Sequence, residues 1–186
     1  MKYLYILILL ILSLASFDNN LDKNEDWMSI YENYIYDNID TTVYITISTC
    51  YVDDDSIPEL CLFGTCYFEG SIILSQYAGT VTQHQCYWSP HYIERSGLID
   101  DGYAKYGYYG DHIIELNKGV FTEILHTEAV WHDANPPYFV YTINGQVIET
   151  LYGENANEDS CQQLIDTVNQ VYHSKGTSLL MYNSMP

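Results

Sequence analysis

The spacing of apolar residues changes twice along this chain of 186 residues. Over residues 24–39 apolar side chains recur at intervals of three and four, which predicts an amphipathic helix. Over residues 43–150 apolar and polar positions alternate, as they do in half-buried strands. Over residues 159–176 the helical spacing returns, and Gly176 provides a stop signal. The chain is therefore expected to be an α+β domain.

Turn signals divide the strand region into hairpins. They are Ala78-Gly79-Thr80, Asn117-Lys118-Gly119 and Asn144-Gly145. The Asn-Gly pair is the strongest signal, because it supplies the positive φ angles of a type I′ hairpin turn. Together these turns predict an antiparallel β-meander sheet, with the N-terminal and the C-terminal helix packed on one face of it.

The N-terminal segment has the pattern of an export signal. Lys2 precedes an apolar run over residues 3–14, and Ser13 and Ala15 fit the −3 and −1 positions of a cleavage site. The run is shorter than the roughly 20 residues that span a bilayer. We expect a secreted protein with no membrane association after signal cleavage. The expected divisions are a signal peptide at 1–15, a linker at 16–24, a single α+β domain at 25–176 and a tail at 177–186.

Composition narrows the choice of partners. The chain carries 25 acidic against 6 basic residues, for a formal charge of -19. Such a chain lacks the basic surface that releases counterions from nucleic acid, so nucleic acid is excluded as a partner. Apolar residues make up 47% of the chain, which is enough to build a core. An extracellular protein or a carbohydrate is the expected partner.

The five cysteines would enter an oxidising compartment after export. Strand alternation places Cys50 opposite Cys61 on the side away from the core, and it places Cys66 on the core side, within reach of Cys161. The alternation therefore predicts a Cys50–Cys61 and a Cys66–Cys161 disulfide, with Cys86 unpaired.

Three segments resemble a family of small secreted or lipid-anchored domains from Firmicutes. They are Y-V-D-D-D-S-I-P-E-L at 51–60, Y-A-G-T-V at 77–81 and Y-T-I-N-G-Q-V at 141–147. The first corresponds to the family motif D-x-D-x-D-G-I-P-E-L. The resemblance covers about residues 25–174 and implies a helix, a meander of strands and a closing helix. The family has no established activity.

The acidic segment is a candidate calcium loop, because alternate carboxylates let a short chain surround one hard cation. The candidate metal ligands are Asp53, Asp55, Glu59 and the carbonyl of Ile57. Tyr51 and Ser56 replace the aspartate and the glycine of the family motif, which weakens the case for Ca²⁺. Two interpretations remain, a weak Ca²⁺ site and a solvated acidic turn.

Tyrosine is unusually frequent, with 20 residues against 5 phenylalanines. The tyrosines are densest over residues 102–111, and the candidate ligand-binding residues there are Tyr106, Tyr108 and Tyr109. One interpretation is structural, since amphipathic rings suit a sheet with one wet face. The other is a stacking platform for a sugar or an extended polymer, or a protein-binding patch, with Tyr106 and Tyr108 on the same side of a strand.

The histidines offer a further candidate site. A hairpin in which Leu116 faces Val120 places His112 diagonal to His126 on one face, with His132-Asp133 in a following loop. The chain contains none of the short motifs of serine hydrolases, zinc proteases or nucleotide-binding proteins. The leading hypothesis is a non-catalytic extracellular binding or interaction module. The alternative is a small extracellular hydrolase that uses a histidine and carboxylate site.

Overall fold

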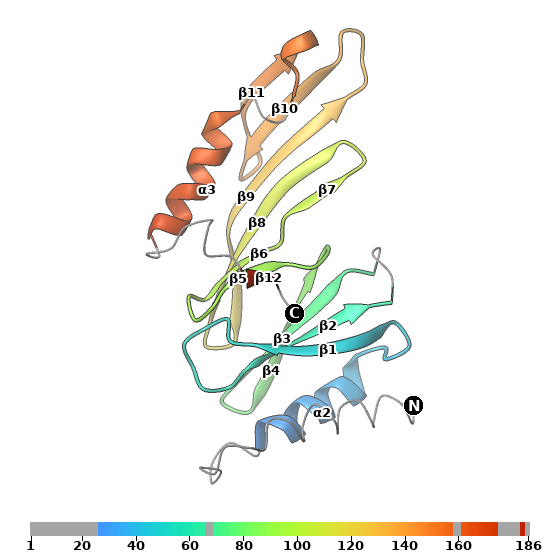
Figure 1. The fold of residues 1–186 in the computed structure, drawn as a ribbon, viewed down its shortest axis with the longest axis vertical. Coiled ribbons are helices and arrows are strands. Elements are labelled where there is room, and N and C mark those ends of the chain that lie inside the picture. The colour runs from blue at the N-terminus through green and yellow to red at the C-terminus, as the bar shows by residue number, and fades with distance from the viewer. Residues whose placement is uncertain (1–25, 66–68, 158–160, 175–182, 185–186) are drawn as a thin grey trace.

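The computed structural model describes residues 26–65, 69–157, 161–174 and 183–184 (Figure 1). The described helices are α2 (Asp26–Asn38) and α3 (Gln162–Ser174), with a short 3₁₀ turn η1 at Gly153–Asn155. Both helices lie within the ranges expected from the sequence. The expected signal peptide and linker lie outside the described residues. No helix of the described segments has the length and apolarity needed to cross a bilayer.

The strands form two antiparallel sheets. The small sheet consists, in spatial order, of β1 (Tyr44–Cys50), β2 (Glu59–Gly64), β3 (Ser71–Tyr77) and β4 (Thr80–Cys86). The large sheet has the order β11-β10-β9-β8-β6-β5-β12, with β7 paired to the free part of β8. Its strands are β5 (His91–Ile93), β6 (Leu98–Asp100), β7 (Tyr103–Lys105), β8 (Tyr108–Asn117), β9 (Val120–His132), β10 (Tyr138–Ile143), β11 (Gln146–Tyr152) and β12 (Asn183–Ser184). The α+β class and the antiparallel meander are confirmed.

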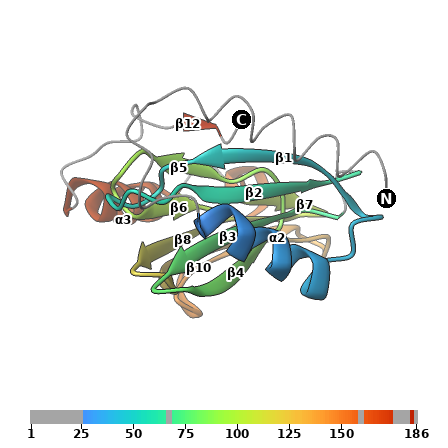
Figure 2. The ribbon, with the colours of Figure 1, turned by 90° about the horizontal axis from the view of Figure 1, so that it is seen from below.

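Helix α2 covers one face of the small sheet (Figures 1 and 2). Its buried Tyr31 and Ile35 pack against Leu62 and Leu74 of the sheet. The Tyr31 hydroxyl donates hydrogen bonds to the carbonyls of Pro58 and Leu74, so its polar end is satisfied inside the core. The phenol therefore fixes α2 to the chain segment that enters β2.

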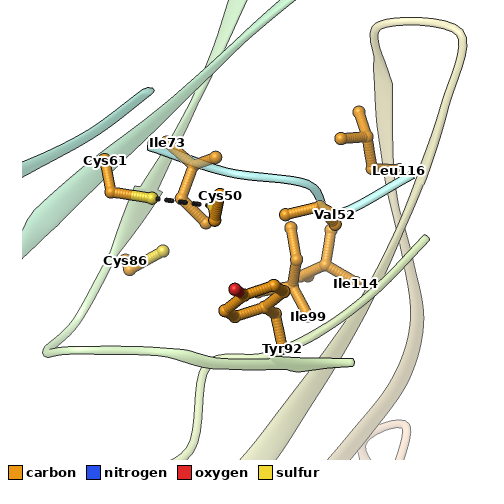
Figure 3. Close-up of a cluster of buried hydrophobic side chains, with 9 residues drawn as sticks. All are labelled: Cys50, Val52, Cys61, Ile73, Cys86, Tyr92, Ile99, Ile114 and Leu116. Carbon is orange, nitrogen blue, oxygen red and sulfur yellow. Dashed lines mark hydrogen bonds between the residues drawn. The ribbon is translucent and has the colours of Figure 1, made fainter. Parts of the chain in front are cut away.

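The second face of the small sheet packs against the large sheet (Figure 3). This inter-sheet core contains side chains from both sheets, all of them buried: Cys50, Val52, Cys61, Ile73, Cys86, Tyr92, Ile99, Ile114 and Leu116. Neighbouring residues on the same strands, such as Ile113, point to the opposite face of the large sheet and contact Val168 and Tyr172 of α3. The layers therefore run α2, small sheet, large sheet, α3.

This layering differs from the expectation of one sheet with both helices on one face. Each helix covers the outer face of a different sheet. The physical reason is that the small sheet is apolar on both faces. The sequence reasoning assigned the face bearing Cys50 and Cys61 to the outside, whereas both cysteines are buried in the inter-sheet core.

The three expected turns are confirmed as two-residue hairpin turns. Ala78-Gly79, Lys118-Gly119 and Asn144-Gly145 all have positive φ at both positions, as type I′ turns require. A fourth turn of this kind, Tyr106-Gly107, joins β7 to β8 and was not expected. Its first residue is a tyrosine, a residue type that seldom adopts positive φ, so the residue pattern predicted a strand at this position.

A β-bulge interrupts the pairing of β8 with β9. Ile113 pairs with Leu125 and Ile114 pairs with Glu123, which leaves Ile124 as an extra residue. Ile124 and Leu125 consequently both lie on the α3 side of the sheet. The bulge reverses the alternation of β9 beyond this point.

The structure brings the Cys50 and Cys61 side chains together, but in a register that differs from the expected one. Cys50 pairs with Glu59 and Cys61 pairs with Ser48, a register two residues away from the expected one. A shift of two keeps the side chains on the same face, and the two thiols form a hydrogen bond with their sulfur atoms 3.3 Å apart. Cys66 lies outside the described residues. Its expected partner Cys161 is buried beside Phe139 and Tyr141.

The inter-sheet core should hold both sheets in one cooperative unit. Ile73→Ala removes a fully buried side chain from that core and should lower the free energy of unfolding by about 2–5 kcal/mol. Val147→Ala, at a position 58% exposed, should change it by less than about 0.5 kcal/mol. Urea unfolding followed by circular dichroism measures both. Two separate transitions, one for each sheet, would contradict the single core.

Oxidation should join Cys50 to Cys61. Their sulfur atoms need only move from 3.3 Å to the bonding distance of about 2.05 Å. Closing this short loop should raise the free energy of unfolding by about 3 kcal/mol relative to the reduced protein. Peptide mapping without reduction identifies the bond, and Cys86→Ser is the matched control that should leave it unchanged. Recovery of Cys50 or Cys61 bound to Cys86 would show that the expectation is wrong.

Candidate functional site

The acidic loop between β1 and β2 brings its carboxylates together. Oxygen atoms of Asp53, Asp55 and Glu59 lie within 4.8 Å of one another. The loop is shaped by its own side chains, because Asp53 accepts a hydrogen bond from the Asp55 amide and Asp55 accepts one from the Ile57 amide. The three expected carboxylates thus lie close together, and the side chain of Ile57, whose carbonyl is the fourth expected ligand, packs in the cluster beneath α2.

Glu59 is the buried member of this group, with 1% of its surface exposed. Its Oε2 accepts a hydrogen bond from the Val52 amide at 2.8 Å, and its Oε1 accepts one from the Ser75 hydroxyl at 3.3 Å. Burial raises the pKa of Glu59 to about 8. The carboxyl group is therefore largely protonated at neutral pH unless a cation stabilises its charge.

The chain places a cation of its own at this loop. The Arg95 guanidinium donates a hydrogen bond to the Asp55 carbonyl at 3.1 Å and lies 4.5 Å from the ring centroid of Tyr51. Tyr51 occupies the position of the first aspartate in the family motif. The chain thus holds a cation–π contact at this corner of the loop.

The three candidate tyrosines do not lie together. Tyr106 is at the tip of the β7–β8 turn, 83% exposed, with the Lys105 ammonium 5.3 Å from its ring centroid. Tyr108 begins β8 and is 48% exposed. Tyr109 points to the other side of the sheet and packs near Phe139. Tyr106 and Tyr108 therefore do not share one side of a strand, because a turn separates them.

Tyr108 belongs to a larger aromatic surface on the face of the large sheet opposite α3. We call this surface the aromatic face. Strand register places its members in two adjacent cross-strand rows. The rows are Tyr108, Val130, Val140 and Thr150, and His132, Tyr138 and Tyr152. In the second row the His132 and Tyr138 rings stack at 4.5 Å, and Tyr152 follows at 5.4 Å.

A tyrosine extends this face toward the histidines. The ring of Tyr103, on β7, lies over Gly110, where an added Cβ would come within 3.1 Å of it. Its hydroxyl donates a hydrogen bond to Glu128 on β9 at 3.0 Å. Glycine is needed at position 110, because an added Cβ would come within 2.1 Å of the Thr127 carbonyl oxygen and would also crowd the Tyr103 ring.

Beyond Tyr103 the same face carries two adjacent histidines. His112 and His126 are directly paired across β8 and β9, with ring centroids 4.0 Å apart. The expected diagonal relation was wrong by two residues of register, one because Asn117 rather than Leu116 faces Val120 at the turn, and one because of the bulge. His132 lies six residues farther along β9, about 20 Å from His126 at the rise of a strand, so His132-Asp133 does not join them.

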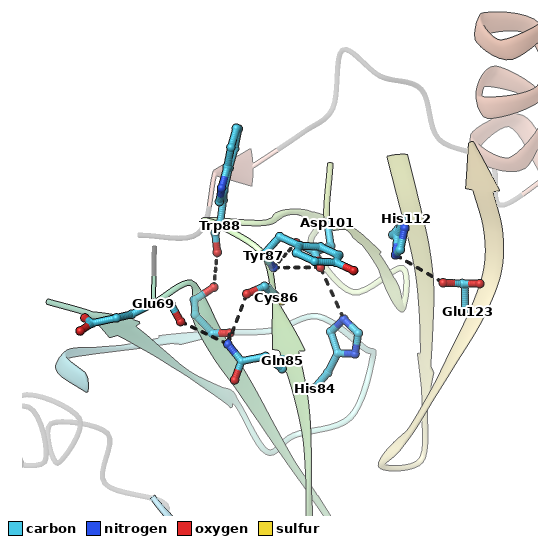
Figure 4. Close-up of polar contacts among 10 residues, drawn as sticks. Glu69, His84, Gln85, Cys86, Tyr87, Trp88, Asp101, His112 and Glu123 are labelled. Carbon is cyan, nitrogen blue, oxygen red and sulfur yellow. Dashed lines mark hydrogen bonds and ion pairs between the residues drawn. The ribbon is translucent and has the colours of Figure 1, made fainter. Parts of the chain in front are cut away.

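The sequence reasoning missed the carboxylates that complete this group (Figure 4). The bulge turns Glu123 to the side of the histidines, and its Oε2 lies 3.4 Å from the His112 Nδ1. From the small sheet His84 approaches the same region, with its Nε2 3.9 Å from Asp101. The Asp101 amide in turn donates to the His112 carbonyl at 2.9 Å. Only the fold brings these segments together, so no local signal reveals them.

Burial controls the charge of this group. It lowers the pKa of His112, and His126 beside it lowers that pKa further. Burial also lowers the pKa of His84, with a smaller effect from His112, and raises the pKa of Asp101 to about 7. In the described part of the chain the Nε2 atoms of His84 and His126 are buried without a hydrogen-bond partner. A buried ring nitrogen without a hydrogen-bond partner is the kind of donor that a transition metal can bind.

Comparison of the chain with protein-family models, with curated proteins and with solved structures finds no match in any of the three. The resemblance to the Firmicutes family therefore stays a prediction from the motif residues.

The buried Glu59 should make stability depend on pH. Its folded pKa of about 8 lies above the ordinary value of 4.5. The contribution of Glu59 to the free energy of unfolding is thus complete below pH 4.5 and is lost as the pH rises through 8. The loss should be on the order of 4 kcal/mol, since each tenfold change in proton affinity corresponds to about 1.4 kcal/mol. Glu59→Gln should remove this dependence in denaturation measured from pH 5 to 9, and Asp54→Asn, at an exposed position, should keep it.

Calcium tests the two interpretations of the loop. A Ca²⁺ ion bound by Asp53, Asp55 and Glu59 favours the ionised Glu59, so it should offset the loss of stability at pH 8. At ten times the dissociation constant the gain should be about 1.4 kcal/mol. A solvated acidic turn predicts the same melting temperature with 10 mM Ca²⁺ and with chelator. The Asp53→Asn/Asp55→Asn variant should abolish any specific gain.

Proposed function

We propose that the protein is a non-catalytic extracellular binding module that holds a positively charged protein partner on the aromatic face. The observation that supports this function most is the exposure of tyrosine on a sheet face that α3 does not cover. Tyr108 is 48% exposed and Tyr152 57% exposed, on strands whose other face is buried against α3. The export pattern of residues 1–15 supports the extracellular setting.

The composition of the aromatic face suits a protein interface. Tyrosine is enriched at such interfaces because its ring supplies apolar area while its hydroxyl forms hydrogen bonds. Val130 and Val140 lie half-buried between the rings, so an apolar strip is continuous with the polar groups around it. The stacked rings of His132 and Tyr138 restrict each other's side-chain conformations, which lowers the conformational entropy lost when a partner binds.

The charge of the chain indicates the chemistry of the partner. A formal charge of -19 repels acidic proteins and steers basic ones toward the surface, and complementary charge raises the rate of association. Rings that stand stacked on one another present their edges and hydroxyl groups, rather than the broad faces onto which a sugar would stack. A basic protein segment with aromatic or aliphatic side chains fits both properties.

Soluble copolymers of defined charge provide the probe. A lysine–tyrosine copolymer should bind, with an affinity that falls as salt is added. A glutamate–tyrosine copolymer of equal length should not bind. Tyr108→Ser and Tyr152→Ser should each weaken binding of the basic copolymer about tenfold, as measured by fluorescence anisotropy, since buried tyrosine anchors contribute more than about 1 kcal/mol.

Tyr36→Ser is the matched control, because Tyr36 is 85% exposed but lies on α2. Equal loss of binding in this variant would show that charge alone holds the copolymer, and the aromatic face would have no special role. Binding of soluble chitin or cellulose oligosaccharides that depends on Tyr108 and Tyr152, without binding of the basic copolymer, would assign the face to carbohydrate and overturn the protein partner.

A further inference from the structure

We propose that His112, Glu123 and His126 together bind one Zn²⁺ ion. This site lies on the same side of the large sheet as the aromatic face but shares no residue with its two rows, and the proposal does not depend on the proposed function. One donor atom from each of the three side chains lies within 4.8 Å of the other two. Donors around a tetrahedral zinc ion lie about 3.3 Å apart, so small side-chain rotations bring these three atoms to coordination distance.

The bulge at Ile124 creates this arrangement. In a regular strand Glu123 and His126, three residues apart, would point to opposite faces. With Ile124 as the extra residue, Glu123 pairs with Ile114 and His126 pairs with His112, so all four side chains share one face. Bulges commonly redirect side chains in this way at functional sites.

The environment of the histidines favours a metal over a simple hydrogen-bonded pair. The His126 Nε2 is buried and has no hydrogen-bond partner in the described part of the chain, which costs free energy unless a further group binds it. Glu123 lies beside His112 with half of its side chain exposed, so it can supply the charge that a divalent cation requires. Aromatic rings of Tyr87 and Tyr103 contact His112 edge-on and restrict its orientation.

The donor set selects the metal. Two imidazole nitrogens and one carboxylate are a common zinc ligand set, whereas Ca²⁺ and Mg²⁺ prefer oxygen ligands alone. Three protein ligands leave the fourth tetrahedral position for water or for a group of another molecule. A second trio, His84, Cys86 and Asp101, lies nearby with donor atoms equally close. Its Cys86 belongs to the inter-sheet core with 1% of its surface exposed, so an ion bound there would have to enter apolar packing.

The test is a zinc titration of the purified, metal-free protein in competition with a chromophoric chelator. We expect one equivalent of Zn²⁺ to bind, and His112→Gln and His126→Gln each to raise the dissociation constant at least tenfold. His132→Gln is the matched control on the same strand and should leave the dissociation constant unchanged. Replacement by Co²⁺ should give the intense visible absorption of a four-coordinate site, and this absorption should be lost in the same two variants.

Glu123→Gln keeps the test decisive if a histidine variant fails to fold, because its side chain is half exposed and tolerates substitution. It should weaken zinc binding about tenfold while the circular dichroism spectrum stays unchanged. The absence of any zinc binding, or binding that survives both histidine substitutions, would overturn the proposal. Loss of binding in His84→Gln together with full binding in His112→Gln would also overturn it, since the metal would then lie at the second trio.

Discussion

The burial of both faces of the small sheet is the constraint on which the rest of the structure depends. One face needs α2 as a cover and the other needs the large sheet, so neither sheet can bury its apolar side chains alone. The large sheet then has a second apolar side, where α3 shares its hydrophobic clusters with β5, β6, β8, β9, β10 and β11. On its inner side the large sheet is covered only in part by the small sheet. The aromatic face is the part of that side that stays accessible.

The same constraint explains why so many ionisable groups have shifted pKa values in a strongly acidic chain. Where two sheets and two helices meet, carboxylates near the junctions lose water. Glu59 and Asp101 both have their pKa raised by burial, and each is held by hydrogen bonds from backbone amides. Asp100 accepts a hydrogen bond from the buried Tyr172 of α3, which ties that helix to the centre of the large sheet. These acids serve as internal hydrogen-bond acceptors, so they do not add to the solvated charge of the surface.

Local patterns in the sequence predicted the elements that depend on side-chain spacing and backbone conformation within a few residues. Spacing of three and four identified both helices, and glycine after asparagine or lysine identified hairpin turns, because positive φ is costly for other residues. The number of sheets was not predictable in this way. Cys50 shares its strand face with the polar Thr46 and Ser48, and Ser48 pairs with Cys61, so this face looked like a solvent face until the partner sheet was known. Burial on that side depends on residues more than 30 positions away, such as Ile99 and Leu116.

The histidine group shows how one residue of register decides chemistry. The hairpin expected from the sequence, with Leu116 facing Val120, makes His112 and His126 diagonal neighbours and puts Glu123 on the other side of the sheet. The core requires Phe121 and Leu116 on the inner face and Leu125 on the outer face beside α3. Phe121 and Leu125 are four residues apart, so in a regular strand they would share a face. They lie on opposite faces only because β9 carries Ile124 as an extra residue between them. The bulge is therefore a consequence of packing on two faces, and the assembly of two imidazoles and a carboxylate at one point follows from it.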